Sequence, residues 1–163
     1  MSFDESMLKR LTRLEREMER LRVGDKADST AFLLNNGWKS YTPTWTAATT
    51  NPAIGDGTLS GRYVQIGKLV YCQFKMVAGS TTTFGSGRWR FSYPVAPNTS
   101  YISYQVGSCL LIDSGSGYYS GVSRYETATV MMLIVGGHEV SATLPFTWTN
   151  GDLLMVNIIY EAA

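Results

Sequence analysis

Residues 62–78 read RYVQIGKLVYCQFKMVA, and this stretch decides the fold class. Two runs of alternating apolar and polar residues are separated by Gly67-Lys68, a two-residue turn of the kind that joins antiparallel strands. The apolar positions of the second run share one face: Val70, Cys72, Phe74, Met76 and Ala78. Because side chains alternate across a strand, this pattern predicts a β-hairpin with one face in the core.

Similar strand signals recur through residues 38–163, between turns rich in Gly, Ser and Asn. Trp89, Phe91 and Tyr93 alternate with polar residues and form another one-sided strand that Pro94 ends. Further strands are expected at 41–46, 101–107, 109–113, 121–124, 128–135 and 153–160. Many short strands with turns between them are typical of a mainly β protein. We therefore predict an antiparallel, jelly-roll-like β-sandwich over residues 38–163.

Two of the expected strands do not alternate. Residues 129–135 and 153–159 are apolar on both faces. One face of a strand in an antiparallel sandwich usually meets solvent, so these strands need a second cover. A neighbouring subunit is the expected cover, and the alternative is a loop or residues 35–38 folding over them.

Charge separates the chain into two parts. Residues 1–26 hold 13 of the 27 charged residues, whereas the rest holds 15 of the 16 glycines and 19 of the 20 aromatic residues. We predict a coiled-coil helix over residues 1–24, a linker over 25–37 and the β-domain over 38–163. The net charge of +1 argues against nucleic acid as a partner. We expect neither a signal peptide nor membrane insertion, because the start is charged and no long apolar run occurs.

The N-terminal part carries an apolar stripe with four-three spacing. Ser2 followed by Glu5 is a capping box, and Gly24 is a helix stop signal. The stripe occupies heptad positions a and d: Met7, Leu11, Leu14, Met18 and Leu21. This spacing predicts a coiled coil. The alternative is an amphipathic helix that packs on its own domain.

The charges beside the stripe favour parallel helices. Arg10 and Glu17 fall at position g, and Glu15 and Arg22 fall at position e. In a parallel coil Arg10 meets Glu15 and Glu17 meets Arg22, and both pairs are opposite in charge. Residues 10–15 also resemble the short trimerisation motif of parallel three-stranded coils, with Arg at g, apolar residues at a and d, and Glu at e. The prediction is a parallel homotrimer, and because a coil of about three heptads is marginal alone, the rest of the chain should also trimerise.

Candidate catalytic and metal-binding residues are sparse. His138 follows Gly136-Gly137 and is expected in a turn, and no Gly-x-Ser-x-Gly nucleophile motif is present. Asp56 and Asp152 adjoin glycines, which is turn chemistry rather than a pair of catalytic carboxylates. Cys72 and Cys109 fit no metal spacing, and whether they are bonded to each other stays open. We expect no catalytic site, metal or cofactor.

The best candidates for ligand binding are Tyr118 and Tyr119, in a loop context of Gly and Ser. Loops on a rigid β-domain often carry recognition, and Tyr provides contact area at little entropic cost. The alternative is that one of the two packs inward and the other lies at the rim. Arg88 and Arg90 share a face and either meet an acidic surface or are solvated.

Several separated motifs resemble one family of proteins. They are YTPTWT (41–46), GDGTLSGRY (55–63), GKLV (67–70), TFGSGRWRFSYP (83–94), PFTWTNGD (145–152) and YEAA (160–163). The resemblance is to the small β-domain of many tailed-bacteriophage virion proteins, often labelled minor tail, tail-fibre or fibre-tip proteins, frequently with a short N-terminal coil. It covers most of residues 41–163.

The resemblance implies a non-enzymatic homotrimer located on the virion. The expected role is a tail fibre or spike for host-surface attachment, with a host glycan or protein as ligand and other virion proteins bound through the N-terminal region. A tail fibre usually has a longer N-terminal anchoring domain, whereas this coil begins at residue 2, so a trimeric capsid fibre or decoration protein is the alternative. A polysaccharide depolymerase is a further and weaker alternative.

Overall fold

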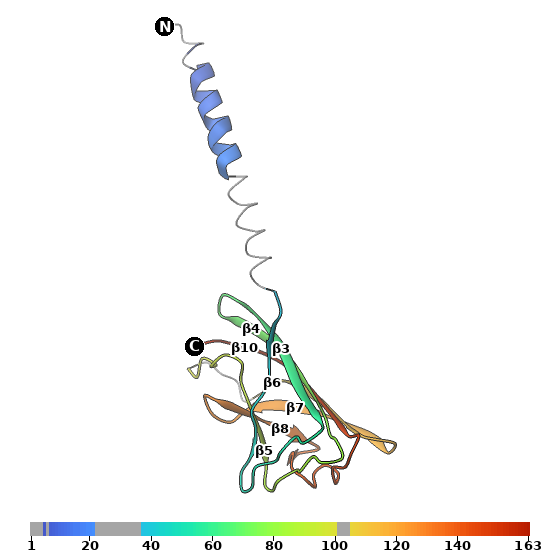
Figure 1. Cartoon of the computed structure of the whole chain (residues 1–163). Helices are drawn as coiled ribbons and strands as arrows, with labels where there is room; N and C mark the ends of the chain where they lie inside the picture. The colour runs from blue at the N-terminus through green and yellow to red at the C-terminus, as the bar shows by residue number, and fades with distance from the viewer. Residues whose placement is uncertain (1–4, 6, 22–36, 101–104) are drawn as a thin grey trace. The chain divides into compact units, whose positions relative to one another are not determined.

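The computed structural model describes residues 5, 7–21, 37–100 and 105–163 of the 163-residue chain. The chain divides into two compact units, Met1–Gly37 and Trp38–Ala163. The described residues of the first unit form a helix over 5 and 7–21, and the second unit, called the body below, contains all the described strands (Figure 1). Among the described residues, no helix is both long and apolar enough to cross a membrane.

The body is built from one antiparallel sheet of ten strands. The strand order is β1-β3-β4-β10-β6-β7-β8-β5-β2, with β9 paired to β8. The strands are β1 Lys39–Tyr41, β2 Trp45–Ala47, β3 Thr58–Ile66, β4 Leu69–Val77, β5 Trp89–Ser92, β6 Gln105–Asp113, β7 Gly117–Tyr125, β8 Val130–Val135, β9 His138–Glu139 and β10 Leu153–Glu161. The C-terminal strand β10 therefore lies in the middle of the sheet, between β4 and β6.

The sheet curls so that its two edges approach each other. Phe74 on β4 and Phe91 on β5 are separated by four strands in the sheet order, yet their ring centroids are 5.1 Å apart. The first and last strands in the order, β1 and β2, are consecutive in sequence and only residues 42–44 lie between them. The Tyr41 hydroxyl of β1 donates a hydrogen bond to the Ser92 carbonyl of β5 at 3.1 Å, which ties one edge of the sheet to the other side.

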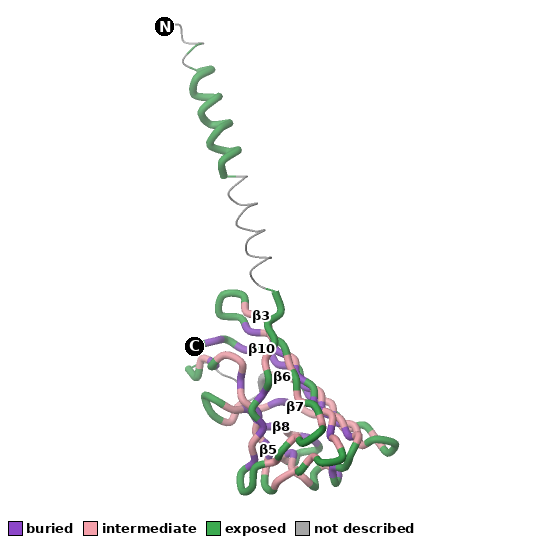
Figure 2. Tube along the Cα trace, viewed as in Figure 1, coloured by how far each residue is buried: buried purple, intermediate pink, exposed green. Residues whose placement is uncertain are grey.

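The core fills the inside of the curl. Buried side chains occur at alternate positions of β4 and β10, and Figure 2 shows buried positions distributed over the strands of the body. The core contains a cluster of aromatic rings, with centroid separations of 4.8 Å for Trp45–Trp89, 4.9 Å for Trp89–Trp148 and 4.7 Å for Phe146–Trp148. Aromatic rings at such distances bury large areas, so this cluster is a main source of stability for the body.

The mainly β prediction and the hairpin of residues 62–78 are confirmed. Gly67 adopts a φ of 58°, which suits the two-residue turn between β3 and β4. The two-sheet sandwich is not confirmed, because all the described strands belong to one curled sheet. The single strand expected at 41–46 is wrong: the buried Pro43 lacks the N–H that a continuous ladder needs, and the chain passes there from one edge of the sheet to the other.

The two strands that are apolar on both faces differ in how they are covered. Met132, on the outer face of β8, is only 4% exposed in the single chain and lies beside its register partners Arg90 and Arg124. The aliphatic parts of arginine side chains cover apolar surface in this way, so Met132 is already buried within the single chain. For the half-buried Val130 and Ile134 on the same face, cover by a neighbouring subunit stays a prediction. Ile159 on the outer face of β10 is 59% exposed, and for this strand the second cover stays a prediction.

Candidate interaction surfaces

The N-terminal helix presents its apolar stripe openly. The stripe residues are between 54% and 68% exposed: Met7, Leu11, Leu14, Met18 and Leu21. Apolar residues at positions a and d of a helix are normally buried against another helix or a domain. Figure 2 shows the whole described helix in the exposed class.

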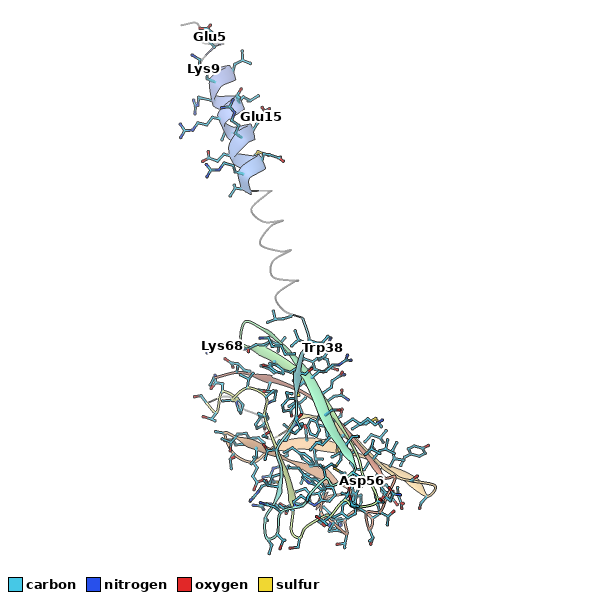
Figure 3. All side chains as sticks on the ribbon, in the orientation of Figure 1. Glu5, Lys9, Glu15, Trp38, Asp56 and Lys68 are labelled. Carbon is cyan, nitrogen blue, oxygen red and sulfur yellow. The ribbon has the colours of Figure 1, made fainter. Side chains whose placement is uncertain are left out.

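The charged residues beside the stripe are also exposed. Arg10, Glu15 and Glu17 lie on the described helix, and Figure 3 labels Glu15 there. Arg22, the last of the predicted coil residues, lies outside the described residues, as does the capping Ser2. The pairing of these charges between helices stays a prediction.

The body has two ends that differ in character. Trp38, where the chain begins the body, and Lys68, in the β3–β4 turn, lie at one end, and Asp56 lies at the other (Figure 3). These are called the Trp38 end and the Asp56 end below. The Asp56 end is formed by the connections before β3, after β4, between β6 and β7, and before β10. Loops on a rigid scaffold are common sites of recognition, so the hydrogen bonds that hold these loops in place matter for recognition.

Asp56 fixes two of these loops to each other. Its carboxylate accepts hydrogen bonds from the Thr81 amide at 2.8 Å, the Thr81 hydroxyl at 2.9 Å and the Ser80 hydroxyl at 2.7 Å. These bonds, led by the one from the Thr81 amide, favour the ionised form and lower the pKa of Asp56 to about 2. The turn role expected for Asp56 agrees with this geometry.

Asp152 does the same for the β6–β7 hairpin, from a fully buried position. One carboxylate oxygen accepts from the Ser114 amide at 2.9 Å, and the other accepts from the Thr149 amide at 2.6 Å. The carboxylate therefore joins the hairpin tip to the loop before β10. Both of these donors are backbone groups, so the carboxylate fixes the path of the two loops, and the Thr149 hydroxyl also donates to it at 3.3 Å.

Tyr118 and Tyr119 lie on opposite faces of β7. Tyr118 is 78% exposed and pairs across the ladder with Ile112. Tyr119 is half-buried against Phe146, with ring centroids 5.0 Å apart. Tyr118 is therefore the more exposed of the two tyrosines, and contact of either with a ligand stays a prediction.

Arg88 and Arg90 bind an acidic group of their own chain. Arg88 and Arg90 each approach the Glu126 carboxylate at 2.8 Å, and Arg88 reaches Glu139 at 3.2 Å. The Glu126 side chain is only 8% exposed. Hydrogen bonding to Glu126 raises the pKa of Arg90. These arginines are therefore part of the outer packing of β5 and β8 and are not simply solvated.

A second apolar surface, the outer patch, lies on the convex side of the sheet at the Trp38 end. It consists of Trp38, Ile66, Leu69, Tyr71 and Ile159. Ile66 pairs with Leu69 and Tyr71 pairs with Ile159, so these residues share one face of three adjacent strands. The Trp38 ring meets the Tyr71 ring with centroids 5.4 Å apart.

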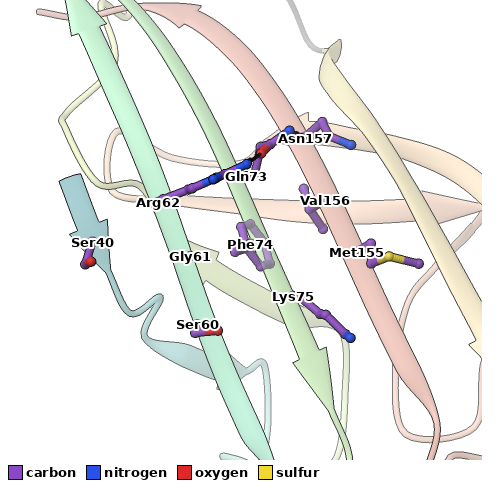
Figure 4. Close-up of a pocket in the computed structure, with 10 residues that line it drawn as sticks. All are labelled: Ser40, Ser60, Gly61, Arg62, Gln73, Phe74, Lys75, Met155, Val156 and Asn157. Carbon is purple, nitrogen blue, oxygen red and sulfur yellow. Dashed lines mark hydrogen bonds between the residues drawn. The ribbon is translucent and has the colours of Figure 1, made fainter. Parts of the chain in front are cut away.

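A row of polar side chains borders the outer patch. Gln73 accepts from the Arg62 guanidinium at 3.1 Å and donates to the Asn157 side-chain carbonyl at 2.9 Å, so the row crosses β3, β4 and β10 (Figure 4). Gln73 also donates to the Tyr71 hydroxyl. Beyond the row is an open groove of about 480 Å³, lined among others by Ser60, Lys75 and Met155.

Three residues considered for chemistry are His138, Cys72 and Cys109. His138 starts β9 directly after the Gly136-Gly137 turn and is exposed, as expected of a turn position. Cys72 and Cys109 are buried free thiols, and burial raises the pKa of each to about 12. Within the described ranges no group of three His, Cys, Asp or Glu side chains is placed to hold a metal ion.

Sequence reasoning missed the outer patch as a surface. Leu69 and Tyr71 lie on the face of the hairpin opposite the predicted core face, and Ile159 belongs to a strand predicted to be apolar on both faces. The available signal was the hairpin register, which places Leu69 opposite Ile66. The pairing of β4 with the C-terminal strand β10 places Ile159 beside Tyr71, and no local sequence pattern predicts that pairing.

The body and the helix have three surfaces suited to contacts with other macromolecules: the exposed stripe, the outer patch and the hydrogen-bonded loops of the Asp56 end. Over 114 residues the chain is 31% identical to a protein of Haemophilus influenzae named "Mu-like prophage FluMu defective tail fiber protein". The aligned residues are 68% of this chain and 18% of that protein, so the chain spans less than a fifth of its relative's length. No family model matches the chain, and no solved structure matches it. The chain is thus related to a phage tail-fibre protein over most of its length.

Proposed function

We propose that this chain is a structural, non-enzymatic component of a phage tail fibre and is located on the virion. The observation that carries this role is the similarity over 114 residues to a protein named as a tail fibre. The motifs quoted from residues 41–163 support the same class. A mainly β body whose loops at one end are held by hydrogen bonds suits a structural protein that makes contacts through those loops.

The active form in this proposal is a homotrimer joined by the N-terminal helix. The exposed stripe of Leu11, Leu14 and its neighbours supports it, because apolar residues at a and d positions are stable in water only when another surface covers them. The charges of Arg10, Glu15 and Glu17 set the helices parallel. Other virion proteins bind through the N-terminal region.

Two substitutions test the trimer in the full chain. Leu14→Asp together with Leu21→Asp places an unpaired charge in each of two seam layers, which is costly to bury. The mass in solution should fall from three chains to one. Thr12→Asp is the control: Thr12 is also exposed but falls at position b, away from the a and d seam and from the e and g flanks, and its variant should stay trimeric. A wild-type chain that is monomeric at micromolar concentration contradicts the proposal.

The proposed task is attachment to the host surface through the Asp56 end. Tyr118 is the exposed aromatic residue at this end, and three copies per fibre strengthen weak single contacts through effective concentration. Purified protein should bind host cells and slow adsorption of the phage. Tyr118→Ala should weaken binding several-fold and Tyr118→Phe should restore most of it. Equal binding by wild type and Tyr118→Ala removes Tyr118 from the attachment site.

Labelling this protein on purified particles separates tail from head. Label at the tail supports the proposal, whereas label at regular points on the capsid supports a decoration protein. Release of reducing sugar from host polysaccharide by the purified chain would instead support a depolymerase and contradict the non-enzymatic role.

A further inference from the structure

The outer patch is apolar and partly open in the single chain. Trp38 is 45% exposed, Ile66 42%, Leu69 52% and Ile159 59%. The residues come from adjoining strands and from the start of the body, so they form one continuous area rather than scattered exposed positions. Contiguous exposed apolar areas of this kind mark surfaces that another molecule covers.

We propose that the outer patch is where the bodies of neighbouring copies contact one another, which rests on the trimer proposed above. The occupant of the patch is a second copy of this chain. The helix and the body then contribute two separate parts of the same assembly.

The polar row beside the patch is joined by hydrogen bonds within the chain. The Arg62 guanidinium carbon lies 4.3 Å from the centroid of the Trp38 ring, and the same group donates to Gln73 at 3.1 Å. Gln73 in turn donates to Asn157. Burying polar groups that keep their hydrogen bonds costs little, whereas burying unpaired ones is expensive. The amide groups of Gln73 and Asn157 can therefore enter an interface without a large desolvation penalty, whereas the exposed Arg62 guanidinium, hydrogen-bonded to the neutral Gln73 amide, belongs at the wet edge of such an interface.

The composition of the patch and of its rim also fits a protein partner. Trp, Tyr and Arg are enriched at the centres of interfaces, where Lys and Glu are depleted. Here the rim has exposed Lys68 and Glu161. Lys68 precedes Leu69 in the chain, and Glu161 pairs with Leu69 across the β4–β10 ladder. A rim with both signs of charge is self-complementary between identical copies, because Lys68 of one can meet Glu161 of the next.

The helix stripe alone offers less area than a typical stable interface. Its stripe has large side chains at roughly half exposure, on the order of 100 Å² each, and five of them give about 500 Å² per chain. A stable interface buries about 800 Å² per partner. The exposed parts of Trp38, Ile66, Leu69 and Ile159 add roughly 400 Å² on the same basis, which brings the sum into that range.

The place of the patch along the chain points to the same occupant. Sixteen residues separate Leu21 from Trp38, and a chain of that length reaches at most about 60 Å. Three associated helices therefore tether three copies of the patch at an effective concentration of about a millimolar. A weak apolar contact between bodies forms readily under these conditions.

The test uses the full chain and two readouts. Ile159→Asp and Leu69→Asp change exposed positions, so the monomer should fold and its thermal unfolding should change little. Trp38 is the reporter: it is 45% exposed, whereas Trp45, Trp89 and Trp148 are at most 8% exposed. Acrylamide quenching of tryptophan fluorescence therefore follows the patch. Tyr118→Asp is the control, because Tyr118 is exposed at the opposite end of the body.

Sedimentation at a series of concentrations should show that each patch variant raises the trimer dissociation constant by about tenfold or more. Trp38 should be protected from acrylamide in the wild-type trimer and quenched in the patch variants and in the coil variant Leu14→Asp/Leu21→Asp. Tyr118→Asp should match wild type. A wild-type trimer whose mass is unchanged by Ile159→Asp and whose Trp38 is freely quenched overturns this inference and leaves the coil trimer standing.

A monomeric wild type overturns the trimer and this inference together. If host polysaccharide rather than assembly protects Trp38, the patch is a ligand site and the inference is wrong. If Trp38 is protected in the coil variant when it is monomeric, its own chain covers the patch, and the inference is also wrong.

Discussion

Replacing Asp152 by Asn should destabilise the body by about 3 kcal/mol, because one buried carboxylate holds two loops of the Asp56 end. Asp152 is fully buried, and its two oxygens each accept from a different backbone amide, Ser114 N at 2.9 Å and Thr149 N at 2.6 Å. Asparagine has the same shape but only one acceptor oxygen, so one of these amides must face an NH₂ group. Losing a hydrogen bond to a charged group costs about 1.5–3 kcal/mol, and the amide that faces the NH₂ group of the buried side chain puts the effect at the upper end of this range.

Urea unfolding and thermal unfolding at one fixed protein concentration measure this effect, because assembly makes both depend on concentration. A loss of 3 kcal/mol corresponds to a fall of roughly 6–12 °C in the unfolding temperature for a domain of this size. Amide hydrogen exchange should accelerate at Ser114 and Thr149 before it does in the central strands. Asp113→Asn is the matched control, because it removes the same charge from a half-buried site in the same hairpin. If Asp152→Asn costs no more than this control, the carboxylate does not hold the loops and the reasoning fails.

Three further predictions concern other parts of the body. The pKa of Asp56 falls from 3.8 to about 2 on folding, so the stabilising effect of its carboxylate should be complete above pH 4 and lost as the pH falls through 2. Urea unfolding at different pH values measures this pH dependence of stability, and Asp56→Asn should remove it. Because burial raises their pKa to about 12, Cys72 and Cys109 should not react with a thiol reagent at pH 8 until the chain is unfolded, and two reacting thiols in the native protein would contradict this. Gly107→Ala would drive a Cβ into the backbone carbonyl of Asn157 and should cost about 3 kcal/mol in unfolding free energy, whereas an unchanged value would show that the strands can separate locally.

The hairpin of residues 62–78 could be predicted because its information is local. The turn, the alternation and the apolar face all lie within one short stretch, and the structure pairs β3 with β4 as the sequence indicates. The one-sided strand at Trp89 and Phe91 was predictable for the same reason, and both residues are fully buried. Local patterns of this kind fix which face of a strand is buried whatever its neighbours are.

The curl of the sheet and its closure could not be predicted from local patterns. They depend on which distant strands pair, such as β10 between β4 and β6. Residues 41–46 look like one strand, yet Tyr41 and Trp45 belong to strands at opposite ends of the sheet order. Only the cross-sheet contacts, such as the bond from Tyr41 to Ser92, reveal that these ends meet.

For the candidate sites, part of the answer was available in the sequence. Adjacent residues of a strand point to opposite faces, so Tyr118 and Tyr119 cannot both face solvent if the loop is part of a strand. The structure extends β7 back to Gly117, which separates the two side chains, and Phe146 then covers Tyr119. The sequence did not specify which tyrosine would be outward, because that depends on the register with β6 and on Phe146 from a distant loop.

The two ends of the body favour one direction of assembly. The Trp38 end has exposed apolar side chains and follows the helix in sequence, whereas the Asp56 end has polar loops held by the carboxylates of Asp56 and Asp152. Apolar surface is stabilised by association, while ordered polar loops lose little entropy when they bind a ligand. If three chains join through the helix and the outer patch, the Asp56 end is the part left free, and Tyr118 lies on it. Cross-linking that finds Tyr118 of different copies in contact, instead of Ile159, would therefore reverse the direction we propose for the fibre.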